Sequence, residues 1–381
     1  MDLELTEAQR GARDIARRFA RERLERVGVE VDRTHQFPAA AIAELGRLGM
    51  LGVFIPEEYG GAGLDNVAYA LAIEELSVEC ASTGVIVSAH SSLGCWPILG
   101  TGGDEQKRRY LPKMATGEWL GCFALTEPQA GSDAAGLRTR AVRDGDGYVI
   151  NGAKNFITNG PQAGVCIVFA MTEPGRGNHG ISAFIAETAT PGFAITRVED
   201  KMGIHGSHSA ALAFSEMRLP RESLLMSEGE GFKVAMKTLD GGRIGIAAQA
   251  IGIGRAALEA SLKYAQERVA FGRPIASNQA IQWKLADMAV EIDAARLLTL
   301  RAAALKDAGQ SCTKQSAMAK LFAAEAAMKA ATEAVQIHGG YGYTREFKAE
   351  RYFRDAKITE IYEGTSEIQR LVIAGQVLRN G

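Results

Sequence analysis

The sequence lacks the features that would place its main function in a membrane or on nucleic acid. No apolar run approaches the roughly 18 residues needed to cross a bilayer. The formal net charge of −2 gives no reason to expect nucleic acid or an anionic membrane as the main partner. The first residues, Met1-Asp2-Leu3-Glu4, do not form a signal-peptide pattern. We therefore expect a soluble protein of the bacterial cytoplasm, or of the mitochondrial matrix if it is a processed eukaryotic form.

Cysteine is also scarce. The five cysteines are odd in number, widely spaced and mostly in apolar surroundings. This pattern favours buried thiols in a reducing compartment over a disulfide framework or a zinc site. No metal site is expected.

Length and patterning predict three domains in an α+β fold. At 381 residues the chain is long for one core. Residues 1–118 carry apolar residues at helical spacing, with start signals at Thr6 and Pro38 and a possible cap at Asp104, and predict an all-helical N-terminal domain. Residues 119–226 predict a small middle domain, an antiparallel β-barrel or sandwich. Residues 227–381 predict a C-terminal four-helix bundle with an appendage.

Turn residues divide the middle domain into short strands. Asp144-Gly145-Asp146-Gly147 and Asn151-Gly152 are typical of hairpin turns. The first run could be a calcium loop, but the later ligands and the glutamate at the twelfth position are missing. The expected strands cover residues 137–142, 148–150, 165–170, 181–186, 193–198 and 210–214, and the expected long helices of the bundle cover residues 229–269, 278–307 and 313–338.

The segment I-Y-E-G-T-S-E-I-Q-R at 361–370 contains the strongest candidate for a catalytic group. It joins a helical run that starts at Phe347 to a second helix, whose start signal is Ser366 followed by Gln369. Glu363-Gly364 is therefore expected in a tight connection where Gly364 can adopt positive φ. A carboxylate on such a corner could be a base held by two helices. The alternative is an ordinary turn with a solvated glutamate.

Three short motifs resemble chemical sites but lack the necessary context. Gly252-Ile-Gly254-Arg-Ala-Ala257 matches a dinucleotide fingerprint in letters, yet no strand precedes it, so close helix packing is favoured. His205-Gly-Ser-His208 could be a metal pair, but no further ligands cluster near it, and a hairpin turn is favoured. Gly131-Ser132-Asp133 is not the elbow of a serine nucleophile.

Four stretches offer free backbone N–H groups, hydroxyls or a cation. Each alone would be typical of a surface loop, whereas together they predict a large phosphate-bearing cofactor bound without a Rossmann domain. They are Leu125–Asp133, Lys154–Gly160, Gln336–Gly342, and Arg268 with Phe271-Gly272-Arg273.

Four motifs, in this order, resemble the acyl-CoA dehydrogenase family over essentially the whole chain. The similarity of Leu239–Ile246 and of the C-terminal run is to the short-chain (butyryl-CoA) branch. The resemblance implies the same helical–β–helical order of domains and FAD as cofactor. The motifs are L-T-E-P-Q-A-G-S-D at 125–133, R-V-A-F-G-R-P-I at 268–275, Q-I-H-G-G-Y-G-Y at 336–343 and I-Y-E-G-T-S-E-I-Q-R at 361–370.

The resemblance also implies which residues hold FAD between the β domain and the bundle. Flavin and ribityl contacts are expected from Phe123, Leu125, Thr126, Gly131, Ser132, Phe156, Ile157 and Thr158. Pyrophosphate and adenosine contacts, usually to a neighbouring subunit's FAD, are expected from Arg268, Phe271, Gln279, Gln336, Ile337, His338, Gly339 and Gly340. Thr365, Ser366 and Glu367 would complete the site. FAD shared between subunits implies a homo-oligomer, in this family usually a tetramer built as a dimer of dimers.

By the same resemblance, Glu363 would remove the pro-R α-proton of an acyl-CoA thioester while hydride leaves the β-carbon for the flavin. The product would be a trans-2-enoyl-CoA, and the electrons would pass to an electron-transfer flavoprotein. The Glu363 backbone N–H and a ribityl hydroxyl would hold the thioester oxygen, and exclusion of water should raise the pKa of the base towards neutrality. Contacts to the thioester are expected from Ser132, Asp240, Gly241, Gly242, Arg243 and Gly364.

Two positions bear on this assignment. The isovaleryl and long-chain branches carry their base just before the arginine of the first bundle helix, where this chain has Gly242, which favours Glu363. Phe156 stands where the family commonly has tryptophan beside the flavin. It keeps an aromatic face without an indole N–H, so FAD binding is expected to survive while electron transfer is affected.

The acyl group is left open. A linear short chain is the first choice, and a branched short-chain or cyclic carboxyl-CoA is next. An acyl-CoA oxidase would share the chemistry, but oxidases of this family are typically much longer. A non-catalytic flavin- or acyl-CoA-binding scaffold would have no need of Glu363.

Overall fold

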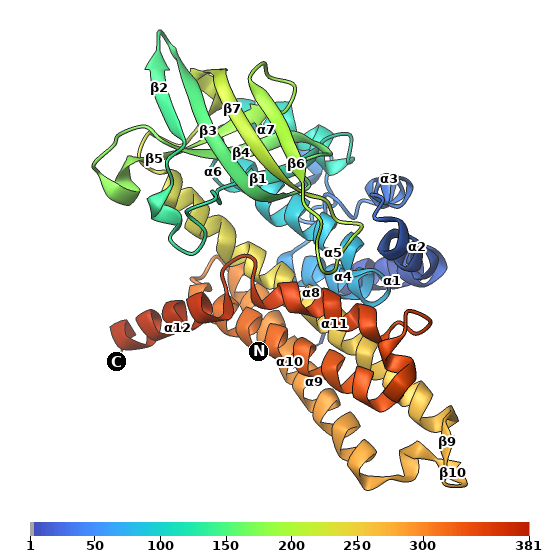
Figure 1. Cartoon of the computed structure of the whole chain (residues 1–381). Coiled ribbons are helices and arrows are strands. Elements are labelled where there is room, and N and C mark those ends of the chain that lie inside the picture. Colours follow the sequence, from blue (N-terminus) through green and yellow to red (C-terminus); the bar gives the residue numbers. More distant parts are fainter. Residues whose placement is uncertain (1–3, 381) are drawn as a thin grey trace.

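The computed structural model describes residues 4–380 and has three parts: N-terminal helices, a twisted β-sheet, and a long C-terminal group of helices (Figure 1). This order confirms the predicted α+β architecture. The five cysteines are buried and free, as the sequence predicted. No helix within the described range is long and apolar enough to cross a bilayer.

The N-terminal part begins where the sequence predicts. Thr6 and Gln9 form a reciprocal capping box, in which Gln9 N–H donates to Thr6 Oγ1 at 3.2 Å and Thr6 N–H donates to Gln9 Oε1 at 2.9 Å. The prediction of Asp104 as the cap of α7 is wrong by one residue. Gly103 occupies the cap position, and Asp104 is the first helical residue. The helices are α1 (Glu7–Phe19), α2 (Glu25–Thr34), α3 (Ala39–Arg47), α4 (Asn66–Glu79), α5 (Ala81–Ser88), α6 (Trp96–Thr101) and α7 (Asp104–Ala115).

The middle part is one sheet with the strand order β6-β7-β3-β2-β4-β5-β8, and β1 lies beside β4. Most pairs are antiparallel, as expected, but β1 runs parallel to β4, and β2 meets β4 in a single parallel bridge. The strands are β1 (Leu120–Ala124), β2 (Arg140–Asp144), β3 (Gly147–Thr158), β4 (Ala163–Met171), β5 (Ile181–Glu187), β6 (Phe193–Val198), β7 (Ser209–Pro220) and β8 (Leu224–Leu225).

Of the two predicted hairpin turns in this sheet, one is confirmed and one is wrong. The turn between Asp144 and Gly147 joins β2 to β3. Asn151-Gly152 instead lies inside β3, at a bulge against β7. Glycine is required there because a Cβ atom on Gly152 would lie 2.5 Å from Oγ1 of Thr139. Residues 154–158, which belong to one of the four stretches expected to offer free backbone groups, also lie in β3.

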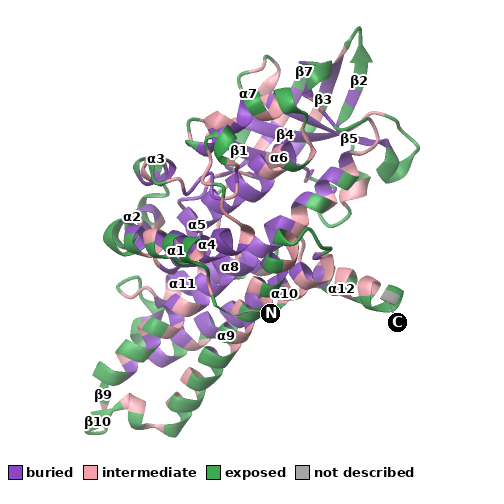
Figure 2. Ribbon diagram, turned by 180° about the vertical axis from the view of Figure 1, so that it is seen from behind, coloured by how far each residue is buried: buried purple, intermediate pink, exposed green. Residues whose placement is uncertain are grey.

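The C-terminal part is built around α8, which packs against α9, α10 and the N-terminal helix α4. Buried residues of these helices form one continuous apolar cluster, so the two helical parts share a core (Figure 2). The three long helices begin and end within two residues of the predicted bounds. The helices are α8 (Gly231–Glu267), α9 (Gln279–Asp307), α10 (Thr313–His338), α11 (Ala349–Lys357) and α12 (Ser366–Asn380).

A two-stranded ribbon was not predicted. It consists of β9 (Val269–Ala270) and β10 (Arg273–Pro274) and lies at the end of α8 that is farthest from the large sheet (Figure 1). Its tip carries Phe271, whose side chain is fully exposed and whose φ is +52°. Two-residue strands carry too little hydrophobic pattern to be read from sequence.

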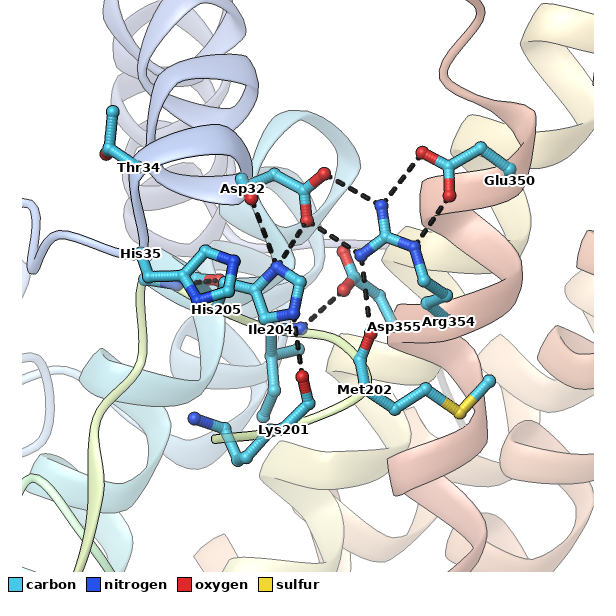
Figure 3. Close-up of polar contacts among 12 residues, drawn as sticks. Asp32, Thr34, His35, Lys201, Met202, Ile204, His205, Glu350, Arg354 and Asp355 are labelled. Carbon is cyan, nitrogen blue, oxygen red and sulfur yellow. Dashed lines mark hydrogen bonds and ion pairs between the residues drawn. The ribbon is translucent and has the colours of Figure 1, made fainter. Parts of the chain in front are cut away.

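A cluster of charged groups joins all three parts of the chain beside α11 (Figure 3). Arg354 donates to Asp32 of α2 at 2.7 Å and to Glu350 of its own helix at 2.6 Å. The Asp32 carboxylate also lies 2.9 Å from Nδ1 of His205, in the turn between β6 and β7, and Nε2 of His205 faces the Lys201 carbonyl at 2.7 Å. His205 thus links the turn between β6 and β7 to helix α2 and, through Asp32, to Arg354 of α11. Because α11 leads directly to residues 358–363, the cluster fixes the approach to the candidate base.

Candidate active site

Glu363 and Gly364 form a sharp corner between the end of α11 and the start of α12. Their φ angles are +51° and +94°, so a non-glycine residue with left-handed backbone precedes a glycine. The Nε2 atom of Gln369 donates to the Gly364 carbonyl at 2.8 Å and to the Glu363 carbonyl at 3.2 Å. Nζ of Lys320 donates to the same Gly364 carbonyl at 2.8 Å. The predicted corner is confirmed, and two buried side chains hold its strained backbone.

The start of α12 differs in detail from the prediction. The cap is Thr365, whose Oγ1 accepts from the backbone N–H of Ile368 at 3.3 Å. Ser366, the predicted cap, is the first helical residue, and its hydroxyl has no partner in the described part of the chain. Gln369 is free to turn towards the corner because it is not used in a capping box.

The Glu363 carboxylate is enclosed although part of the residue reaches solvent. Its Oε2 atom is buried and has no hydrogen-bond partner among residues 4–380. That atom lies over α8 at Gly242, where an added Cβ atom would be only 2.0 Å from it. Burial raises the pKa of Glu363 to about 8, against the opposing positive charges of Lys320 and Arg243. A desolvated carboxyl group with an unsatisfied oxygen is suited to exchange a proton with a bound molecule.

Gly242 and Arg243 of α8 lie near this carboxylate. Arg243 is paired with Asp240 at 2.9 Å, and Asp240 accepts from Oγ1 of Thr313 at 2.6 Å. Burial raises the pKa of Asp240, although its hydrogen bond and Arg243 oppose the shift. The structure therefore brings three predicted site residues, Gly242, Arg243 and Glu363, into one place.

The loop after β1 and the end of β3 form a second group of predicted residues. The backbone N–H of Asn155 donates to the Thr126 carbonyl at 2.9 Å, which places the two stretches side by side. Phe156 has a φ of +59° and a side chain that is 61% exposed, so its ring projects from the sheet. Ser132 is exposed, whereas Leu125 and Ile157 are buried.

A buried ion pair that sequence reasoning missed holds this group together. Nζ of Lys154 lies 2.8 Å from Oε1 of Glu127 and donates to the Leu125 carbonyl at 3.1 Å. Glu127 also accepts from the backbone N–H groups of Arg138 and Thr139. These contacts hold the pKa of Glu127 at about 2 against burial, which acts in the opposite direction.

The remaining predicted cofactor residues lie elsewhere. Arg268, Ile337, His338, Gly339 and Gly340 line a cavity of about 550 Å³ between the C-terminal ends of α8 and α10. A Cβ atom on Gly339 or Gly340 would meet nothing within 4 Å, so the backbone is open to an approaching molecule. Phe271, Gln279 and Gln336 are exposed in the same region. This end of the bundle is remote from the large sheet (Figure 1).

The predicted residues fit FAD in two respects that the structure displays. An exposed aromatic ring stands beside the Thr126 backbone, as a flavin face requires. An arginine and two unobstructed glycines line one cavity, as a pyrophosphate requires. Since the two groups lie at different ends of one chain, one FAD molecule would have to contact two chains to use both.

Known proteins resemble this chain over its whole length. Three domain families match in order: "Acyl-CoA dehydrogenase, N-terminal domain" over residues 6–118, "Acyl-CoA dehydrogenase, middle domain" over 122–217 and "Acyl-CoA dehydrogenase, C-terminal domain" over 229–378. The mitochondrial short-chain specific acyl-CoA dehydrogenase of Mus musculus is 52% identical over 378 residues, which cover 99% of this chain and 92% of that protein.

Two solved structures have nearly the same fold. Butyryl-CoA dehydrogenase from Megasphaera elsdenii has a TM-score of 0.98 and 47% identity, with 100% of both chains covered. A chain in a structure described as the electron transferring flavoprotein of Acidaminococcus fermentans has a TM-score of 0.98 and 51% identity, again with 100% of both chains covered.

Proposed function

This chain belongs to the acyl-CoA dehydrogenase family, and we propose that Glu363 is the base with which it dehydrogenates a short, straight-chain acyl-CoA. The enzyme is an oxidoreductase that acts on the CH–CH bond of its substrate, forms the α,β-enoyl-CoA and passes electrons to an electron-transfer flavoprotein. The observation that carries the assignment of the base is the buried, unpartnered Oε2 atom of Glu363, held over Gly242 on a strained corner.

Proton removal requires the carboxylate to be both ionised and close to the α-carbon. The corner supplies position, because two helices and the side chains of Lys320 and Gln369 fix it. Burial supplies basicity, because it raises the pKa of Glu363 to about 8. The α-proton would move to Oε2, which has no other partner. We assign the Glu363 backbone N–H to the thioester oxygen, where it would stabilise the enolate-like charge.

We propose FAD as the cofactor, which supplies the hydride acceptor when bound. The residues assigned to the flavin end are Phe123, Leu125, Thr126, Gly131, Ser132, Phe156, Ile157 and Thr158. Those assigned to the pyrophosphate and adenosine of a neighbouring chain's FAD are Arg268, Phe271, Gln279, Gln336, Ile337, His338, Gly339 and Gly340, with Thr365, Ser366 and Glu367 near the corner. The exposed Phe156 ring and the cavity at Arg268 support this division.

We propose that the acyl-CoA thioester lies between the first loop of the sheet and α8. Ser132, Asp240, Gly241, Gly242, Arg243 and Gly364 are assigned to it. The nearness of Gly242 to the base supports this placement. The 52% identity to a short-chain specific enzyme supports a short, linear acyl group over a branched or cyclic one.

A homotetramer, built as a dimer of dimers, is the proposed assembly. Large apolar side chains lie exposed along α9, among them Trp283 at 61% and Val290 at 69%, as they would if another chain covered that face. The five buried free cysteines support a reducing compartment such as the bacterial cytoplasm, or the mitochondrial matrix for a eukaryotic form.

An anaerobic titration tests the function. The purified flavoprotein would receive a panel of acyl-CoAs while the visible flavin absorbance is followed, with Glu363→Gln in parallel. Bleaching by a short acyl-CoA in the wild type but not in the variant is the expected result. A flavoprotein that no acyl-CoA bleaches would overturn the proposed reaction, and preferential bleaching by a branched or cyclic acyl-CoA would overturn the proposed substrate.

A further inference from the structure

Lys320 is a lysine with no exposure to solvent, placed in the middle of α10 beneath the Glu363 corner. Its ammonium group donates to the Gly364 carbonyl at 2.8 Å. Within residues 4–380, no carboxylate oxygen lies within 4.0 Å of it. A buried ammonium group without a close counter-ion is costly and is retained only where its surroundings compensate it.

The largest compensation of the buried Lys320 charge comes from the charge of Glu363. Burial is the main influence on each group: it raises the pKa of Glu363 to about 8 and lowers the pKa of Lys320 to about 8. The first influence that opposes burial at Glu363 is the charge of Lys320, and the first that opposes it at Lys320 is the charge of Glu363. Each group is thus the principal counter-charge of the other.

We propose that Lys320 is a positioning and charge-compensating residue for the base: its ammonium group fixes the Gly364 carbonyl and favours the ionised form of the Glu363 carboxylate in a buried site. The inference rests on the proposed role of Glu363 as the base. Lys320 is not among the residues assigned above to the substrate or the cofactor, so its proposed action is through the corner and through its charge.

Arg243 is the other cation that faces Glu363, but it does not replace Lys320. Its charge is already paired with Asp240 at 2.9 Å, and Asp240 is held in turn by Thr313. Without the Lys320 charge, the Glu363 carboxylate would face only Arg243, whose charge is already paired with Asp240. The other titratable groups that act on Glu363 or Lys320 are Tyr69 from α4, Glu360 and Tyr362 before the corner and Glu367 from α12.

The chemical consequence is a compromise in the strength of the base. When the α C–H bond breaks, its proton forms an O–H bond to Glu363, and the carboxylate charge disappears while that of Lys320 stays. A nearby cation therefore makes Glu363 a weaker proton acceptor than burial alone would. In return, a larger fraction of the enzyme holds the ionised form near neutral pH.

Two substitutions separate charge from packing. Lys320→Met removes the charge and the hydrogen bond at similar length, and Lys320→Arg keeps a permanent charge. Lys329→Met, on the same helix, is the matched control, because Lys329 pairs with Glu291 at an exposed site. The carboxylic C=O stretch of Glu363 would be titrated by infrared difference spectroscopy on each FAD-loaded protein, with the Glu363→Gln spectrum subtracted, beside the pH profile of kcat/KM.

We expect Lys320→Met to raise the midpoint of both titrations by about one pH unit or more and to lower kcat/KM about tenfold at pH 7. Lys320→Arg and Lys329→Met should leave the midpoints within a few tenths of a unit of the wild type. Equal midpoints in Lys320→Met and wild type would overturn the inference, whatever the change in kcat. If Lys320→Met does not fold, Lys320→Gln takes its place with the same two outcomes.

The outcomes also distinguish this inference from the proposed function. An active Glu363→Gln variant would remove the base and the inference with it. An inactive Glu363→Gln variant with an unshifted Lys320→Met profile would leave the base in place and remove only the role of Lys320.

Discussion

The Cα atom of Gly242 and the Oε2 atom of Glu363 are so close that a methyl group on Gly242 would lie 2.0 Å from that oxygen. The carboxylate therefore occupies the space in which every other residue type would place its side chain. A side chain at residue 242 and the Glu363 carboxylate in its present position therefore exclude each other sterically.

Gly242→Ala should displace the carboxylate from its position. We expect kcat/KM to fall about 100-fold or more, with about 1–3 kcal/mol lost from the free energy of unfolding through overpacking. Steady-state kinetics and urea denaturation measure the two effects. Gly11→Ala is the control, because Gly11 is an exposed position of α1 where a Cβ atom would meet no described atom within 4 Å. It should add about 0.5–1 kcal/mol of stability without changing the kinetics. Wild-type activity in Gly242→Ala would contradict the steric relationship.

The pH dependence of kcat/KM should follow the ionisation of Glu363. Because its pKa is raised to about 8 by burial, the free enzyme holds the inactive protonated form below that value. We expect kcat/KM to rise about tenfold per pH unit at acidic pH and to level off above pH 8. A profile that levels off near pH 5 would mean that Glu363 is solvated, or that another group is the base.

Replacing Glu363 by glutamine should stabilise the fold at alkaline pH. The pKa of Glu363 is about 8 in the folded chain against a usual 4.5, so between these values the folded state holds a proton that the unfolded chain has released. The contribution of the protonated Glu363 carboxyl group to the free energy of unfolding is complete below the unfolded pKa. It is lost as the pH rises to about 8. We expect the free energy of unfolding of Glu363→Gln to exceed that of the wild type by roughly 2–4 kcal/mol at pH 9. At pH 4 the difference should be much smaller. Denaturation at both pH values tests this, and an equal difference at both would contradict it.

The Glu127–Lys154 ion pair should be essential for the structure of the loop after β1. Lys154→Met leaves a carboxylate buried without its counter-ion, which typically costs about 3–5 kcal/mol. We expect a lower free energy of unfolding and weaker FAD retention, measured by denaturation and by flavin release. Arg176→Met breaks an exposed pair with Glu173 and should cost less than about 1 kcal/mol. A similar loss in the free energy of unfolding in the two variants would show that the buried pair does not stabilise the fold more than an exposed pair does.

Much of the fold could be predicted because the relevant signals are local. The capping box at Thr6 and the apolar period of α8, α9 and α10 depend on residues a few positions apart. The corner at Glu363-Gly364 was predictable for the same reason, since it lies between two helical periods. The wrong hairpin at Asn151-Gly152 shows the limit of local signals: the same two residues suit a turn or a bulge, and only the neighbouring strands decide.

The charges that surround the site could not be predicted as readily. Lys154 was seen only as part of a loop, although it is buried against Glu127. Lys320 did give a signal, because it stands on the alanine stripe that contains Ala317, Ala323 and Ala324, where a lysine is unexpected. Its partner, however, is a backbone carbonyl far along the chain. Such pairings depend on the tertiary structure, because their partners are far apart along the chain and form no recognisable pattern of spacing in the sequence.

The most direct measurement of the central claim is hydrogen exchange at the α-carbon of the substrate. FAD-loaded wild type and Glu363→Gln would be incubated in D2O with a 3-thia-acyl-CoA, in which sulfur replaces the β-carbon and no hydride can leave. The α-position should take up deuterium with the wild type, while Glu363→Gln, binding the same ligand, should exchange about 100-fold or more slowly. Exchange at the wild-type rate by Glu363→Gln would contradict the assignment of Glu363 as the base.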